Sequence, residues 1–384
     1  MIDMKILMVN YEFPPIGGGA GHAHRCLLHE YAREEDLQID VVTSAPAPGW
    51  IREEFASQIR IHKIGIHKKE LHYWRKREVL EWLFKAGKYY RKLVESQDYD
   101  LAHAFFGFPS GWLCYQTTRE IPYMISLRGS DVPGYNIRLG VDYKLLGGLF
   151  RRIWRQAALV VANSRGLCDL AHRFMPDLPI EVIPNGIDTS RFRPRAEREV
   201  HSPIQVLSVG RLIRRKRIDL MLEAAALAKA AGIHFQLNIA GQGNLWHELQ
   251  DQAAAKGVSR QVRFLGRVPP EAMPAIYQQN DIFLMTSAHE GMSNAMLEAL
   301  ACGLPIITTR CEGVEELMGE NGIVIEEAQA GAILRAIQTI ADNPEHYRQM
   351  SQAARQRAAE FSWEATAAAY IECYHKIQGA SGTP

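Results

Sequence analysis

The feature that most constrains the fold of this chain is a regular alternation of short apolar runs with helix-length segments. Short runs of β-branched and apolar residues, separated by helices, are typical of parallel sheets with crossover helices. The pattern therefore predicts an α/β protein with doubly wound sheets. We expect strands at 5–10, 39–44, 59–64, 101–106, 123–127, 159–163, 181–183, 205–209, 235–240, 262–265, 282–286, 305–309 and 322–325.

A length of 384 residues exceeds what one ordinary core accommodates and favours two domains. We place the domain boundary at Pro184–Asp188, because the sequence Pro-Asn-Gly favours a turn. A polar, proline-bearing stretch (191–203) follows, and a new strand begins at Gln205. We therefore predict two Rossmann-like domains, 1–184 and 185–362.

Composition excludes several classes of protein. There are 44 Lys and Arg against 43 Asp and Glu, so no global field favours nucleic acid. The six cysteines are scattered without CxxC spacing, which argues against a disulfide framework or a zinc site and suits a reducing cytosol. No apolar stretch approaches the roughly 18–20 residues that span a bilayer. We expect a cytoplasmic protein.

Residues 60–92 have the most biased composition in the chain, because they are rich in basic and aromatic residues. Lys and Arg outnumber Glu there, and Trp74, Trp82 and Phe84 are interleaved. A basic helix with such side chains suits an anionic membrane surface, on the cytoplasmic face of the membrane. The alternative is a surface helix whose aromatic side chains pack inward on the first sheet. The sequence leaves both open.

Two glutamates lie on either side of the start of a predicted short helix. Ser293 or Asn294 can cap this helix, and Gly303 gives a stop signal. Glu290 therefore lies on the loop before the helix and Glu298 inside it. Carboxylates accept hydrogen bonds from hydroxyls and a helix N-terminus attracts phosphate, so a ligand with both groups would fit. The alternative is an exposed helix with two solvated acids.

A glycine-rich segment (13–22) follows the first predicted strand. Gly17, Gly18 and Gly19 would let backbone N–H groups approach a ligand, with the positive end of the next helix facing it. The segment is neither a G-x-G-x-x-G fingerprint nor a P-loop, since no Lys-Ser/Thr follows. A flexible loop is the alternative.

A basic loop (208–217) follows the first strand of the second half. Open α/β sheets bind ligands at the C-terminal ends of their strands, so Arg211 and Lys216 are expected to converge on one diphosphate. Arg supplies a planar fork and Lys a compact charge. A solvated basic loop is the alternative, and no role is assigned to Arg214, Arg215 and Arg217.

Two weaker motifs remain. Gly241 lies in a glycine turn (239–244) at a strand end, where a nucleoside could approach. Asp98-Tyr99-Asp100 has the DxD pattern of a metal site. It precedes the strand at 101–106, however, at the edge of the sheet opposite the ligand, so we reject a metal there.

In combination, these motifs resemble the retaining glycosyltransferases with the GT-B fold, of the glycosyl transferases group 1 or family 4 type. Glycogen-synthase-like and mannosyltransferase-like members share Pro-Pro followed by Gly-Gly near the N-terminus. They also share Gly-Arg with a Lys five residues after the Arg, and two Glu separated by seven residues. The resemblance extends from Lys5 to about Tyr374. It implies two domains facing a cleft, with a last helix (363–378) packing back on the first.

The resemblance also implies a task for each candidate residue. Gly18 and Gly19 would approach the donor phosphate. Arg211 and Lys216 would neutralise the diphosphate and act in catalysis. Glu298 would accept hydrogen bonds from the ribose hydroxyls. The transferred sugar would be held by Glu290 and by the backbone of Met292, Ser293 and Asn294.

One departure concerns Arg128, in Leu127-Arg128-Gly129-Ser130-Asp131. Many relatives carry a His there, which touches the donor sugar. A guanidinium cannot trade protons but can clamp a carboxylate or phosphate. We therefore hypothesise that Arg128 contacts an anionic group of donor or acceptor. An ion pair with Asp131 is the alternative.

The implied reaction moves a sugar from a UDP- or GDP-sugar to a hydroxyl of a glycan or lipid-linked glycan, with retained configuration, in cell-surface polysaccharide or glycolipid synthesis. No metal or other cofactor is expected, since the two cations and a helix N-terminus would absorb the charge of the leaving diphosphate. A nucleotide-sugar epimerase, a phosphorylase or a non-catalytic sugar-nucleotide-binding protein could use the same scaffold.

Overall fold

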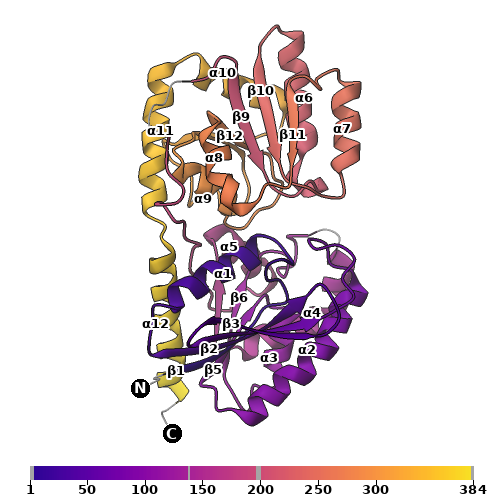
Figure 1. The fold of residues 1–384 in the computed structure, drawn as a ribbon, viewed down its shortest axis with the longest axis vertical. Helices are drawn as coiled ribbons and strands as arrows, with labels where there is room; N and C mark the ends of the chain where they lie inside the picture. Colours follow the sequence, from indigo (N-terminus) through magenta and orange to yellow (C-terminus); the bar gives the residue numbers. More distant parts are fainter. Residues whose placement is uncertain (1–3, 137–138, 196–199, 382–384) are drawn as a thin grey trace. The chain divides into compact units, whose positions relative to one another are not determined.

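The chain divides into two compact units (Figure 1). The first comprises Met1–Asn185 and Trp363–Pro384, and the second Gly186–Ser362. The sequence prediction placed the division one residue earlier, between 184 and 185. Residues 196–199 of the predicted polar connection lie outside the described part of the chain. This computed structural model describes residues 4–136, 139–195 and 200–381.

An eight-stranded sheet forms the centre of the first unit, in the order β3-β4-β2-β1-β5-β6-β7-β8. All neighbours pair in parallel except β3, which is antiparallel to β4. The central strands are buried at nearly every position because helices cover both faces. The strands are β1 (Met4–Val9), β2 (Leu37–Ala45), β3 (Trp50–Ala56), β4 (Ile59–Gly65), β5 (Leu101–Phe105), β6 (Tyr123–Leu127), β7 (Leu159–Ala162) and β8 (Glu181–Val182).

Strand β3 was not predicted from the sequence. It reads WIREEFA and is exposed over most of its length, because it pairs on one side only, with β4. Its charged residues Arg52, Glu53 and Glu54 do not form an apolar run. Charges on an edge strand are a common protection against further strand pairing. The apolar pattern detects buried strands and therefore misses this one.

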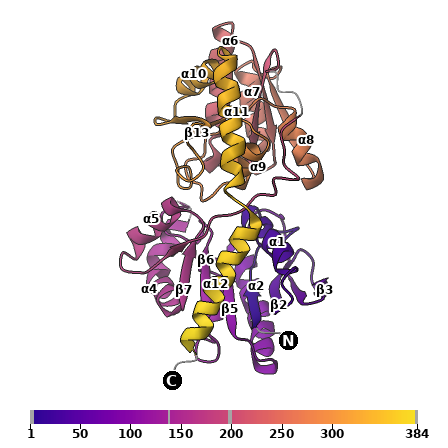
Figure 2. The same ribbon diagram turned by 90° about the vertical axis from the view of Figure 1, so that its left-hand side faces the viewer.

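Among the described residues of this unit, six α-helices flank the sheet. Helix α12 packs on α1 and β5 (Figure 2). There the Tyr374 hydroxyl lies 3.0 Å from the hydroxyl of Tyr31 and 2.8 Å from Nδ1 of His103. This last helix ends three residues beyond the predicted 378. In the described residues, no helix combines the length and the apolar composition needed to cross a membrane. The helices are α1 (Gly19–Tyr31), α2 (Lys76–Ser96), α3 (Ser110–Tyr115), α4 (Gly140–Gln156), α5 (Arg165–Phe174) and α12 (Trp363–Ser381).

The basic aromatic segment 60–92 is partly strand and partly helix. Its first residues belong to β4 and its last to α2. Trp82 and Tyr90 of α2 are buried against the sheet, as the inward-packing alternative expects. Leu80 and Phe84 point the other way, and each is 65% exposed. Inward packing thus accounts for only part of the apolar content.

The second unit contains a six-stranded parallel sheet in the order β11-β10-β9-β12-β13-β14. Sequence order reverses between β9 and β12, which gives the topological switch point of a Rossmann sheet. The strands are β9 (Ile204–Val209), β10 (Phe235–Ala240), β11 (Val262–Gly266), β12 (Ile282–Met285), β13 (Ile306–Thr309) and β14 (Gly322–Ile325). The α-helices are α6 (Ile218–Ala230), α7 (Trp246–Ala255), α8 (Met273–Gln278), α9 (Asn294–Ala301), α10 (Ala330–Ala341) and α11 (Pro344–Ala359).

Candidate functional site

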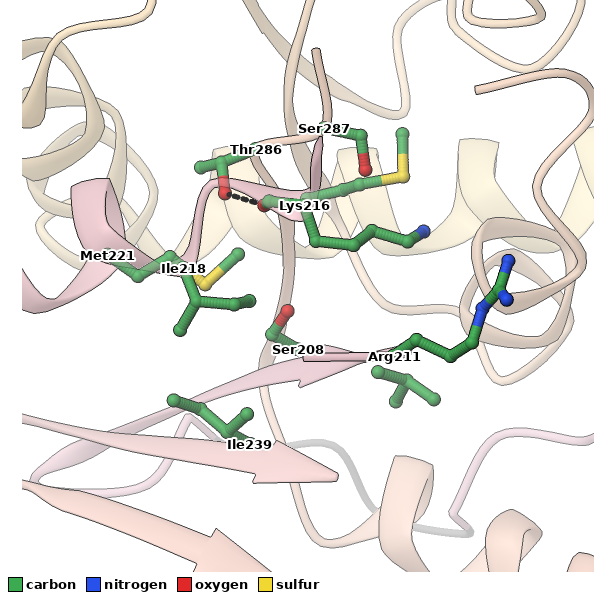
Figure 3. Close-up of a pocket in the computed structure, with 11 residues that line it drawn as sticks. Ser208, Arg211, Lys216, Ile218, Met221, Ile239, Thr286 and Ser287 are labelled. Atoms are coloured by element: carbon green, nitrogen blue, oxygen red, sulfur yellow. Dashed lines mark hydrogen bonds between the residues drawn. The ribbon is translucent and has the colours of Figure 1, made fainter. Parts of the chain in front are cut away.

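The candidate site in the second unit lies at the switch point, where β9 and β12 end side by side. Gly210 follows β9 and Gly241 follows β10. A Cβ at 241 would lie 1.9 Å from the Gly210 carbonyl oxygen, so only glycine lets these two turns pack together. Arg211 and Lys216 extend toward the same side of a small pocket beside these turns (Figure 3).

A short 3₁₀ helix, Arg214–Lys216, positions Lys216. The Thr286 hydroxyl, just after β12, donates to the Lys216 carbonyl oxygen at 2.9 Å (Figure 3). It lies equally close to the Arg217 carbonyl oxygen, at 2.9 Å, and so fixes this turn. Lys216 Nζ lies 2.6 Å from Oε2 of Glu290. Arg211 and Lys216 were predicted from the basic loop and Glu290 from the pair of glutamates, and the structure brings these two motifs into one cluster at the sheet edge.

Opposing effects set the protonation of Glu290. Burial would raise its pKa, but the positive charges of Lys216, Arg215 and Arg211 outweigh burial and hold the pKa below its ordinary value. Glu290 is therefore ionised at neutral pH and can only accept hydrogen bonds.

Helix α9 begins at Asn294, and the Ser293 hydroxyl caps it by accepting the Met296 N–H at 3.4 Å. Of the two predicted caps, Ser293 is the one used. Glu298 lies in the second turn of the helix, while Glu290 lies on the preceding loop. Gly303 stops the helix with φ +68°.

Tyr277 of α8 was not singled out from the sequence. Its buried hydroxyl donates to Oε2 of Glu298 at 2.7 Å. Burial raises the pKa of Glu298 to about 7, against the opposing effects of the Tyr277 hydrogen bond and the charge of Arg191. Glu298 therefore changes its charge near neutral pH. The apolar spacing of α8 carries no signal for this contact, since a tyrosine suits a core equally well.

Glu312 is a further carboxylate at this site that the sequence analysis missed. Its Oε2 accepts the backbone N–H of Glu290 at 3.2 Å, and its Oε1 lies 3.0 Å from Nδ1 of His289. The turn carrying it packs closely on the Glu290 loop, because a Cβ at Gly313 would lie 2.2 Å from the Gly291 carbonyl oxygen. Its place after β13, next to β12, was the available signal.

The glycine-rich loop belongs to the first unit. Gly18 is the N-cap of α1 and Gly19 its first residue, so the positive end of the helix dipole lies at this loop. Gly17, with φ +93°, donates its N–H to Leu71 O at 2.9 Å. The loop is thus held by the segment that leads into α2.

Arg128 follows β6 directly, and its side chain is buried in the first unit. Its Nη1 donates to Asn185 Oδ1 at 3.0 Å and its Nη2 to the Tyr370 hydroxyl at 3.1 Å. The guanidinium also lies over the Phe105 ring, 4.7 Å from its centroid. Nε has no hydrogen-bond partner among the described residues.

The predicted alternative for Arg128, a side-chain ion pair with Asp131, is wrong. The Asp131 carboxylate instead accepts backbone N–H groups, from Arg128 at 2.9 Å and from Gly107 at 2.7 Å. The Asp131 carboxylate is engaged by the main chain, and the Arg128 guanidinium instead donates to Asn185 and Tyr370. Contact of Arg128 with an anionic substrate group stays a prediction.

The predicted catalytic and donor-binding residues fall into two groups. Gly18, Gly19 and Arg128 belong to the first unit, and the others to the second. At the rejected DxD pattern, Asp100 Oδ2 accepts the Lys5 N–H at 2.6 Å and so supports β1. Within the described residues, no group of three His, Cys, Asp or Glu is arranged to hold a metal ion. The second-unit group is Arg211, Lys216, Gly241, Glu290, Met292, Ser293, Asn294 and Glu298.

Cations suited to a diphosphate lie beside carboxylates suited to hydroxyls, at the switch point of a Rossmann sheet. With a second Rossmann-like unit, this defines the class as a glycosyltransferase of the GT-B architecture. Residues 16–191 match the model of Glycosyltransferase Family 4, and residues 190–357 match that of Glycosyl transferases group 1. The chain belongs to this group 1 family.

Several known proteins are similar along nearly the whole chain. Glycogen synthase of Mycobacterium tuberculosis is 25% identical over 97% of this chain and 94% of its own. Sucrose-phosphate synthase of Thermosynechococcus elongatus has the same fold, with a TM-score of 0.83, 20% identity and coverage of 98% and 100%. HepE of Anabaena, in complex with UDP-glucose, gives a TM-score of 0.74 at 19% identity, with coverage of 97% and 100%.

Proposed function

We propose that this glycosyltransferase moves a sugar from a nucleotide diphosphate to a hydroxyl of a glycan or lipid-linked glycan, with retained anomeric configuration. The observation that carries the proposal is the cluster of Arg211, Lys216 and Glu290 at the switch point. The UDP-glucose bound by HepE supports a nucleotide-sugar donor. Cell-surface polysaccharide or glycolipid synthesis is the corresponding pathway class.

In this proposal, the ion pair between Lys216 and Glu290 opens when the donor binds. Lys216 and Arg211 then face the diphosphate, and Glu290 accepts hydrogen bonds from the sugar hydroxyls. Glu298 accepts from the ribose. The leaving diphosphate gains charge as its bond to the sugar breaks, so both cations act more strongly in the transition state than in the ground state.

The acceptor oxygen attacks the anomeric carbon on the face that the diphosphate leaves, and its proton passes to the leaving phosphate oxygen. We assign no protein side chain as general base. The two cations supply the charge that a metal would otherwise provide, so we propose that transfer needs no metal. Chelation by EDTA should then leave turnover unchanged.

A panel of UDP-, GDP- and ADP-sugars tests the proposed function. A transferase should slowly hydrolyse its donor without acceptor and release the nucleoside diphosphate. An epimerase would invert the sugar without release, and a binding protein would leave every donor intact. Either of these last two results would overturn the proposal. The anomeric configuration of the transferred sugar, read by NMR, tests retention.

A further inference from the structure

Helices α2 and α4 leave an apolar surface uncovered on the first unit. Both helices pack on the core through one side, with Trp82 and Tyr90 of α2 and Phe150 and Trp154 of α4 buried. Their outer sides carry large apolar side chains instead of the usual polar ones. The exposed fractions are Leu80 65%, Phe84 65%, Val141 67%, Leu145 78% and Leu146 39%.

The two helices lie on the same face of the sheet, and the short α3 contacts both (Figure 1). Their first turns are joined directly, since Lys76 Nζ lies 2.7 Å from Oδ1 of Asp142. Each helix follows a parallel strand, so both begin at the C-terminal edge of the sheet and run the same way. Leu80 and Leu145 therefore lie about one turn below the junction on their respective helices.

The exposed charges of both helices are mostly cationic. On α2, the outward stripe continues from Phe84 to Lys88 and Arg91, and the Lys88 ammonium lies over the Phe84 ring at 4.3 Å. On α4, the stripe continues from Leu145 to Arg152 and Arg155, all exposed. Cations also lie beside the apolar side chains in the first turns, where Lys76, Arg77 and Lys144 are exposed. This charge contrasts with a net charge of only +1 for the chain.

We propose that this α2–α4 surface, made of the outward side chains named above, docks on an anionic lipid bilayer. Apolar side chains would enter the boundary between headgroups and acyl chains, and the cations would meet lipid phosphates. Charge selects this occupant, because exposed cations far outnumber exposed acids on the two helices and an anionic headgroup layer matches that excess. The exposed acid is Glu95, and the exposed cations are Lys76, Arg77, Lys88, Arg91, Lys92, Lys144, Arg151, Arg152 and Arg155. The sequence pointed only to residues 60–92; the contribution of α4 comes from the fold.

The same two helices hold the loops assigned to substrate. The segment before α2 accepts the Gly17 N–H through Leu71 O at 2.9 Å, beside the glycines that begin α1. The Tyr143 hydroxyl, in the first turn of α4, donates to Ser130 O in the loop that follows Arg128. A docked bilayer would therefore lie beside these loops and present a lipid-linked acceptor there. This link to catalysis rests on the proposed transferase function, whereas docking itself does not.

Co-sedimentation with vesicles tests the docking. Wild-type protein should bind phosphatidylcholine vesicles containing about one third phosphatidylglycerol, and should bind pure phosphatidylcholine much more weakly. Binding should fall sharply between roughly 50 and 500 mM salt. The triple variant Leu80→Ser, Phe84→Ser, Leu145→Ser and the double variant Lys88→Glu, Arg91→Glu should each lose more than about tenfold in affinity.

Leu227→Ser is the matched control, because Leu227 is 42% exposed on α6 of the second unit; its vesicle binding should equal that of wild type. All substitutions are at exposed positions, so thermal melting should be unchanged. Failure of wild type to bind anionic vesicles at low salt, or equal binding by the triple variant, would overturn the proposal. Self-association that the triple variant abolishes, without vesicle binding, would also overturn it and assign the surface to a second copy of the chain. Donor hydrolysis, measured without lipid, reports on the transferase function separately.

Discussion

At the scale of single residues, Lys216 should be the side chain whose loss slows the chemistry most. It faces Glu290 at 2.6 Å and is proposed to meet the leaving diphosphate. Lys216→Ala should lower turnover by about 10²–10³-fold, the usual effect of removing a preorganised charge. Arg214→Ala is the control, since Arg214 is exposed in the same short turn and should change turnover by less than about twofold. Steady-state kinetics of both variants decide, and an unchanged rate for Lys216→Ala contradicts its role.

Replacing Glu290 by glutamine should affect turnover, whereas replacing Glu298 by glutamine should affect nucleoside diphosphate affinity. Glu290→Gln should lower turnover while nearly preserving affinity for the nucleoside diphosphate, because Glu290 is assigned to the sugar. Glu298→Gln should instead weaken nucleoside diphosphate binding, because Glu298 is assigned to the ribose. Calorimetric titration with the diphosphate, paired with kinetics, measures both quantities. If both variants lost the same affinity for the nucleoside diphosphate, the assignment of Glu290 to the sugar and Glu298 to the ribose would be wrong.

Donor binding should depend on pH through Glu298. With a pKa of about 7, this carboxyl is protonated below neutral pH and then accepts ribose hydroxyls less well. Affinity for the nucleoside diphosphate should therefore fall as pH is lowered from about 8 to 6. Tyr277→Phe removes a hydrogen bond that opposes the effect of burial, so the midpoint should move to higher pH. Glu298→Gln should have lost this titration, and an identical pH profile in that variant would refute the assignment.

The site residues that could be predicted from the sequence follow the end of a predicted strand or lie at the start of a predicted helix. Ser293, Glu290 and Lys216 lie at such places, and the contact between Lys216 and Glu290 follows from a parallel sheet with a switch point. Tyr277 and Glu312 were missed for different reasons. Tyr277 reaches Glu298 across two helices, which no local spacing encodes. Glu312 lies in a turn that the sequence analysis did not examine as a strand end.

At the scale of elements, Tyr370 connects α12 to the sheet of the first unit. Its hydroxyl accepts from Arg128 Nη2 at 3.1 Å and from Ser126 Oγ at 3.0 Å in a buried setting. Tyr370→Phe leaves two buried donors without this acceptor, which should cost roughly 1–3 kcal/mol of unfolding free energy. Tyr115→Phe, on the partly exposed Tyr115 of α3, is the control and should cost much less. Denaturant melts of both variants give the comparison, and equal midpoints would contradict the predicted role.

Elements were predicted well where burial dictates their pattern and poorly where it does not. The strands covered on both faces form continuous apolar runs, so they were found close to their observed bounds. Strand β3 pairs at one edge only and carries Arg52, Glu53 and Glu54, so its backbone pairing left no apolar signal. The outward face of α4 was likewise invisible, because exposure of Leu145 depends on which side of the helix meets the sheet.

At the scale of the whole molecule, each core cluster belongs to one unit. The first cluster combines residues from 4–183 with Trp363, Tyr370 and Tyr374 of α12, while the two clusters of the second unit lie between 187 and 358. Residues 186–362 should therefore fold alone, with cooperative thermal melting, and bind a nucleoside diphosphate through the switch-point cluster. Residues 1–185 alone lack the buried tyrosines of α12 and should melt at lower temperature, or aggregate. Joining 363–384 to that fragment through a flexible linker should restore its melting. Circular dichroism and calorimetric titration measure both fragments, and a 186–362 fragment that is unfolded would contradict the autonomy of the second unit.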